Sequence, residues 1–125
     1  MRSYIMRVFS IFFLTICTIS VYAADNSGNY AIWGHGNKSC HSYNLARADD
    51  DSKFKDYIMG YLTAYNHQTP ETYSISRDMN LDEVLTALDD QCQLKPVISF
   101  EEALVSFIIE HYENRMKLPP GGFGR

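Results

Sequence analysis

The sequence predicts an all-α protein, a small helical bundle of three to four helices closed by one disulfide. Two observations predict the helices: apolar residues recur at helical spacing, and two segments begin with the reciprocal polar pattern of a capping box. A third observation, a pair of cysteines outside the apolar N-terminal run, predicts the disulfide. Aromatic residues make up 14% of the 125-residue chain, more than a disordered chain carries, so we expect one compact domain.

The N-terminal segment has the pattern of an export signal. Arg2 and Arg7 precede an apolar run from Val8 to Val21, and the small residue Ala23 suits cleavage by a signal peptidase. The run is too short to span a bilayer as a permanent helix. We therefore expect a periplasmic or secreted protein with no membrane attachment after cleavage.

Three segments follow from this organisation. Residues 1–23 are the expected signal peptide, residues 24–118 the helical domain, and residues 119–125 a flexible tail. The tail begins at Pro119-Pro120-Gly121-Gly122, a sequence that cannot continue a helix.

The cysteines support the same picture. Cys17 lies inside the apolar run, so cleavage leaves Cys40 and Cys92 as the thiols of the exported chain. Such a pair in an oxidising compartment predicts a disulfide, and chain entropy gives a loop of roughly fifty residues about 4 kcal/mol of stabilisation. The alternative for Cys17 is a lipid anchor, although Ile16 stands where such sites want a small residue.

The first half of the domain contains an arm and two predicted helices. Residues 25–37 are rich in Gly and Asn without helical period, so we expect an ordered arm. Ser39 can cap a helix from Cys40 to about Ala48, which the acidic run at residues 49–51 would interrupt. The next helix has one apolar stripe at positions i, i+3, i+4, i+7, i+8 and i+11, namely Phe54, Tyr57, Ile58, Tyr61, Leu62 and Tyr65.

This second helix should end near residues 66–68, because Pro70 disfavours helical geometry in the residue before it. A loop with a short extended piece at residues 72–76 follows. Asn80 with Glu83 predicts the next helix start. Its expected buried face is Leu81, Val84, Leu85, Leu88 and Cys92.

The last predicted helix begins at a second capping box, formed by Ser99 and Glu102. Its apolar positions are again at helical spacing: Phe100, Ala103, Leu104, Phe107 and Ile108, with His111 or Tyr112 next. The helix should fade before Leu118.

Charge excludes one class of partner. Nine Lys and Arg remain after residue 23 against fifteen Asp and Glu, a formal net charge of −6 with His neutral. A nucleic-acid-binding protein needs clustered basic residues, so we expect no nucleic-acid partner. An acidic surface fits a basic protein partner instead.

The sequence contains no arrangement typical of an enzyme or a metal centre. His35 and His41 are close in sequence, but no motif supplies the three or four ligands that zinc requires. We expect three of the four acidic clusters to lie at helix starts or on solvent-facing surfaces, where they favour the helix dipole or are hydrated; the clusters are Asp49-Asp50-Asp51, Asp82-Glu83, Asp89-Asp90 and Glu101-Glu102. We therefore predict no catalytic residues, no cofactor and no metal.

One aromatic group is the candidate binding or packing site. Gly60 lacks a side chain, so another backbone, or Trp33 from the arm, could approach its helix closely. In that position Trp33 would either pack on the helix or complete a pocket with Tyr61 and Tyr65. Asn66 could cap the end of this helix.

Two motifs in this region carry a family resemblance. Trp33-Gly34-His35-Gly36-Asn37-Lys38-Ser39-Cys40 and Gly60-Tyr61-Leu62-Thr63-Ala64-Tyr65-Asn66 resemble a group of small exported bacterial proteins of largely unknown function. That group pairs a Trp-Gly-x-Gly-x-x-Ser-Cys opening with a Gly-Tyr-Leu-x-Ala-Tyr-Asn helix and a second Cys before a Pro. The likeness covers roughly Ile32 to Ile109. The layout is more distantly similar to the Tai-type immunity proteins of type VI secretion and to the HdeA-like acid chaperones.

The resemblance implies a periplasmic helical bundle bridged by Cys40 and Cys92, and a function in protein binding. It transfers no catalytic residues. We therefore expect an exported protein-binding module that acts as an immunity-type inhibitor of a secreted effector, and not an enzyme. The alternative is an acid-stress chaperone of the HdeA type, opened when its carboxylates are protonated. A homodimer is an open alternative for the oligomeric state.

Overall fold

The computed structural model describes residues 24–121. The predicted signal peptide, the alternative lipid anchor at Cys17 and the last four residues of the predicted tail lie outside this range. The chain divides into two compact units, of which the first ends at Ala31 and the second begins at Ile32. In the described part of the first unit, the Asp25 carboxylate accepts hydrogen bonds from the backbone N–H groups of Ser27 and Asn29, both at 2.8 Å.

The second unit contains all the helices of the described residues. Four α-helices and two short 3₁₀ turns follow one another along the chain: η1 (Gly34–Asn37), α2 (Cys40–Arg47), α3 (Ser52–Gln68), α4 (Leu81–Leu94), α5 (Phe100–His111) and η2 (Tyr112–Asn114). Residues 24–121 form no β-strand, and backbone pairing is limited to isolated bridges. The all-α bundle predicted from the sequence is confirmed.

The helices begin and end where local signals predict. Ser39 caps α2, and the acidic run after Arg47 separates α2 from α3. Both capping boxes are present: the Asn80 side chain accepts from the Glu83 N–H at 3.0 Å, and the Ser99 hydroxyl accepts from the Glu102 N–H at 3.1 Å. None of the helices in this part of the chain is both long enough and apolar enough to cross a bilayer.

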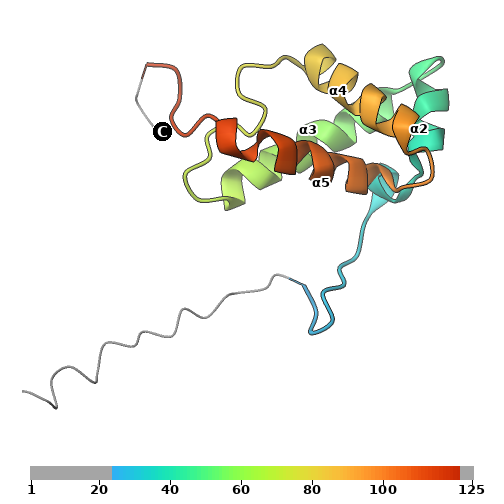
Figure 1. Cartoon of the computed structure of the whole chain (residues 1–125), viewed down its shortest axis with the longest axis horizontal. Helices are drawn as coiled ribbons and strands as arrows, with labels where there is room; N and C mark the ends of the chain where they lie inside the picture. Colours follow the sequence, from blue (N-terminus) through green and yellow to red (C-terminus); the bar gives the residue numbers. More distant parts are fainter. Residues whose placement is uncertain (1–23, 122–125) are drawn as a thin grey trace, which may run out of the picture. The chain divides into compact units, whose positions relative to one another are not determined.

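The arrangement places α4 between α2 and α5. Helices α4 and α5 run side by side in opposite directions, and α2 packs against α4 near its C-terminal end (Figure 1). The starts of α2 and α5 are joined directly, because the Cys40 N–H donates to the Ile98 carbonyl at 2.8 Å and the Phe100 N–H donates to the Lys38 carbonyl at 2.7 Å. Turn η1 packs against both α3 and α5.

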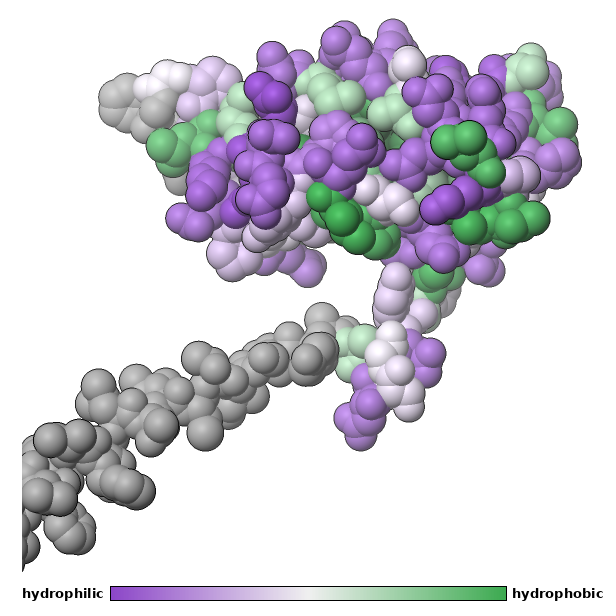
Figure 2. All heavy atoms as spheres, in the orientation of Figure 1, coloured by the Kyte–Doolittle hydropathy of each residue, from purple (hydrophilic) through white to green (hydrophobic). Residues whose placement is uncertain are grey.

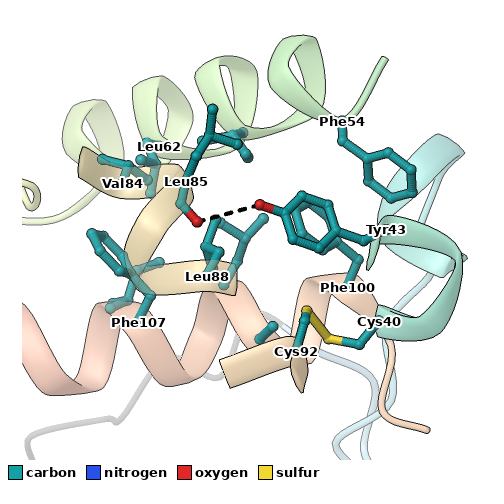
Figure 3. Close-up of a cluster of buried hydrophobic side chains, with 14 of the residues drawn as sticks. Cys40, Tyr43, Phe54, Leu62, Val84, Leu85, Leu88, Cys92, Phe100 and Phe107 are labelled. Carbon is teal, nitrogen blue, oxygen red and sulfur yellow. Dashed lines mark hydrogen bonds between the residues drawn. A yellow bond between two sulfur atoms is a disulfide. The ribbon is translucent and has the colours of Figure 1, made fainter. Parts of the chain in front are cut away.

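The core lies between these helices and is closed by the predicted disulfide. Cys40 and Cys92 are bonded, fully buried, and separated by 52 residues in sequence (Figure 3). Beside the bridge, the Tyr43 and Phe100 rings stack with centroids 4.6 Å apart, and Phe54 meets Phe100 edge-on at 4.9 Å. Aromatic pairs in these geometries add to the stabilisation from burial alone. The remaining buried apolar residues are Ile58, Leu62, Ile75, Val84, Leu85, Leu88, Ala103, Leu104, Phe107 and Ile108.

Two predictions about small details of the fold were wrong. Asn66 does not cap the end of α3, because the helix continues to Gln68; its side-chain oxygen instead accepts the Ile75 N–H at 2.9 Å and fixes the following loop. The close approach expected at Gly60 occurs at Gly36 instead, where a side chain makes it. A Cβ at Gly36 would overlap the ring of Tyr57, whereas a Cβ at Gly60 would meet no atom within 4 Å.

Glu101 differs from its neighbour Glu102. Both lie in the first turn of α5, but Glu101 is only 3% exposed. The Tyr61 hydroxyl donates to its carboxylate at 2.7 Å, which supplies the hydrogen bond that a buried carboxylate needs. The pair joins α3 to the first turn of α5.

Candidate binding surface

The predicted aromatic site does not form as expected. Trp33 is 82% exposed, so the prediction that it packs on a helix is wrong. Tyr61 and Tyr65 are half-buried on α3 and pack against the core. The role of these two tyrosines is therefore structural, while the Trp33 indole is presented to solvent, where it can serve binding.

A polar network joins α2 to α4 at the edge of the core. Arg47 donates two hydrogen bonds to the Asp89 carboxylate, from Nε to Oδ1 at 2.8 Å and from Nη2 to Oδ2 at 2.9 Å. The buried Tyr43 hydroxyl donates to the same carboxylate at 2.8 Å and lies 3.3 Å from the Leu85 carbonyl (Figure 3). Burial, and then the bond to Asp89, raises the pKa of the Tyr43 phenol far above its ordinary value, so the hydroxyl remains a donor.

The network continues to the start of α3 through Asp51. Its carboxylate lies 2.9 Å from Lys55 Nζ and 2.7 Å from Arg47 Nη1. Lys55, and then Arg47, lowers the pKa of Asp51. The result is an electrostatic clamp, defined here as Arg47, Asp51, Lys55 and Asp89, which ties three helices together.

The clamp borders a polar pocket of about 300 Å³ lined by Asn44, Arg47, Asp89 and Gln93. Its charged groups already satisfy one another, and its lining contains no nucleophile. Among residues 24–121, no three His, Cys, Asp or Glu side chains gather closely enough to hold a metal ion. This pocket is therefore best explained as the solvent-exposed edge of the contact between α2 and α4.

The opposite side of α4 is very different. Three large aliphatic side chains are solvent-exposed on α4, on the loop that follows it and on α5: Leu94 at the end of α4 is 82% exposed, Val97 in the loop is 89% exposed, and Ile109 on α5 is 71% exposed. We call these residues, with the groove beside them, the α4–α5 surface.

The groove lies between the two helices. It has a volume of about 280 Å³ and is lined by Gln91, Leu94, Lys95, Ser106 and Glu110. Ile109 follows Ser106 by three residues and so lies on the same side of α5. Figure 2 shows a face of the molecule that is largely hydrophilic, with separate hydrophobic patches set among polar side chains.

A second, more apolar pocket of about 340 Å³ opens between α3 and the start of α4. Ile58, Met59 and Leu62 form one wall, and Met79, Leu81 and Val84 form the other. Most of these residues are buried or half-buried members of the core. The pocket is therefore a depression in the core packing, whereas the α4–α5 surface projects its apolar groups outward.

Sequence reasoning missed the α4–α5 surface, although a signal for it exists. Leu94 and Ile109 are apolar residues that fall outside the buried stripes of their helices, and Val97 follows a proline in a loop. An apolar residue off the stripe of an amphipathic helix is predicted to face solvent. Comparison of the chain with protein-family models, with curated proteins and with solved structures finds no match.

Proposed function

We propose that this chain is an exported protein-binding module that acts as an immunity-type inhibitor of a secreted effector. The observation that carries the proposal is the α4–α5 surface, where Leu94, Val97 and Ile109 are solvent-exposed on a domain whose core is already closed. Binding a protein would bury these side chains, and burial of aliphatic area favours association. The acidic excess of the chain and its resemblance to the small exported proteins support the same role.

Export through residues 1–23 is part of this proposal, and the buried disulfide supports it because such bonds persist in oxidising compartments. Mass spectrometry of the protein recovered from its native host tests it directly. Cleavage after Ala23, or one residue later, is the expected result. A chain that retains residues 1–23, or that carries a lipid on Cys17, contradicts it.

The binding function is tested by affinity capture of the oxidised protein from its native compartment, with mass spectrometry of what co-elutes. One stoichiometric protein is the expected result, and its complex should weaken as salt rises because charge complementarity is screened. A domain captured free of any stoichiometric partner overturns the proposal. A non-enzymatic role belongs to the same proposal, and a purified domain that turns over a substrate would contradict it.

The electrostatic clamp favours a second candidate, an acid-stress chaperone. Protonation of Asp51 in acid would remove its ion pairs with Lys55 and Arg47, of which the Arg47 pair joins α2 to the start of α3. An opened domain would then expose apolar core to client proteins. Near-ultraviolet circular dichroism at about pH 2 to 3 separates the candidates: a chaperone loses its native signal there and binds clients, whereas a signal unchanged from neutral pH excludes that role.

A further inference from the structure

The α4–α5 surface combines its aliphatic groups with carboxylates. Glu102, Ser106 and Glu110 follow one another at intervals of four residues on α5, so they share one face of the helix. Glu113 follows in turn η2, after α5 has ended at His111. All three glutamates are exposed.

Helix α4 contributes the other edge. Asp90 precedes Leu94 by four residues and is exposed on the same face. Lys95 is the one cation among the residues that line the groove, and Gln91 lies 3.4 Å from Glu110 across it. The surface therefore presents separate exposed aliphatic side chains beside the carboxylates of Asp90, Glu102 and Glu110 and the ammonium group of Lys95.

From this juxtaposition we infer that the α4–α5 surface binds a basic amphipathic helix of a partner protein. Leu94, Val97 and Ile109 would contact the aliphatic face of that helix, and Asp90 and Glu110 would face its Lys or Arg side chains. The inference rests on the proposed function, since it specifies the partner segment for the same surface.

A second copy of this chain is a poorer occupant on the same grounds. An interface with two-fold symmetry uses the same surface on both sides, so the carboxylates of Asp90, Glu102 and Glu110 would face a surface with the same excess of negative charge. Like charges brought together at an interface disfavour the complex. A basic helix has no such conflict.

The experiment uses two synthetic helical peptides with the same leucine pattern, one flanked by lysines and the other by glutamates. Backbone amide shifts of isotope-labelled protein report where each peptide binds. The leucine–lysine peptide should shift the signals of Gln91, Leu94, Lys95, Ser106 and Ile109, and its affinity should fall as salt rises. The leucine–glutamate peptide should bind at least about tenfold more weakly.

Matched variants locate the interaction. Leu94→Ser combined with Ile109→Ser should weaken binding of the leucine–lysine peptide at least about tenfold, because buried aliphatic anchors dominate such contacts. Leu45→Ser removes an exposed leucine from α2 instead and should leave the affinity unchanged. Equal binding of both peptides, or shifts confined to the pocket between α3 and α4, overturns the inference.

Two outcomes separate this inference from the proposed function. A native partner captured equally well by the wild type and the Leu94→Ser/Ile109→Ser variant overturns the inference and leaves the binding function intact. Peptide binding at the α4–α5 surface without any stoichiometric native partner supports the inference and counts against the immunity-type role.

Discussion

The two sides of α4 differ in how many of their side chains are buried or bonded to other parts of the domain. Toward α2, the helix supplies Cys92 to the disulfide, Leu88 to the core and Asp89 to the electrostatic clamp. Toward the solvent beside α5, the same helix ends in Leu94, which is 82% exposed. Helix α4 is therefore fixed to the rest of the domain through its α2-facing side, whereas Leu94 on its other side remains exposed.

The largest effect is expected from removing the disulfide. Cys40→Ala with Cys92→Ala frees a loop of 52 residues and should lower the free energy of unfolding by about 4 kcal/mol. For a domain of this size, the melting temperature should fall by about 15–30 °C. Thermal unfolding followed by circular dichroism measures it. An unchanged melting temperature would show that the disulfide does not stabilise the contact between α4 and α2.

The next largest effect compares two leucines of the same helix. Leu88→Ala removes a fully buried side chain and should cost about 3 kcal/mol, whereas Leu94→Ala removes an exposed one and should change stability by less than about 0.5 kcal/mol. Urea unfolding of both variants gives the two values. A similar loss of unfolding free energy at both positions would contradict the difference between the two sides of α4.

A smaller effect is expected at the clamp. Asp89→Asn removes the charge that receives Arg47 and the Tyr43 hydroxyl, and should cost about 1–2 kcal/mol. Asp90→Asn is the matched control, because the Asp90 side chain is exposed and makes no hydrogen bond or ion pair within residues 24–121; the substitution should be nearly neutral. Chemical unfolding of both variants at neutral pH provides the test, and an equal loss at the two sites would argue against a structural role for the clamp.

The smallest effect concerns pH. The folded pKa of Asp51 lies below its ordinary value near 3.9, so its stabilisation is present above about pH 4 and is lost as pH falls through the folded pKa. The contribution should stay under about 1 kcal/mol, because Lys55 and Arg47 are partly exposed to solvent. Asp51→Asn should therefore flatten the decline in unfolding free energy between pH 6 and pH 3. A decline as steep as that of the wild type would assign the acid sensitivity to other carboxylates.

The parts of the fold that depend on neighbouring residues could be predicted from the sequence. Apolar stripes located α3, α4 and α5, and the Asn80 and Ser99 caps located two helix starts, because each signal lies within a few residues of the feature it predicts. The pairing of Cys40 with Cys92 followed because the expected cleavage leaves no other thiol.

Two features that the sequence did not predict depend on contacts between segments that are far apart in the sequence. Glu101 stands next to Glu102 in the same sequence pattern, yet it turns inward because Tyr61, 40 residues earlier, meets it from α3. The arm was expected to contact α3 through Trp33, but Gly36 makes the close contact by admitting the Tyr57 ring. Neither outcome has a local signal, since each requires knowing which helices become neighbours.

The complete burial of the Cys40–Cys92 bridge has a consequence for thiol chemistry. A reductant must bring a thiolate sulfur onto one of the two disulfide sulfurs, and neither is accessible while the domain is closed. The rate at which a dilute thiol cleaves the bond therefore reports how often the domain opens. The Cys40–Cys92 disulfide can therefore be used as a built-in probe of how fast the domain unfolds.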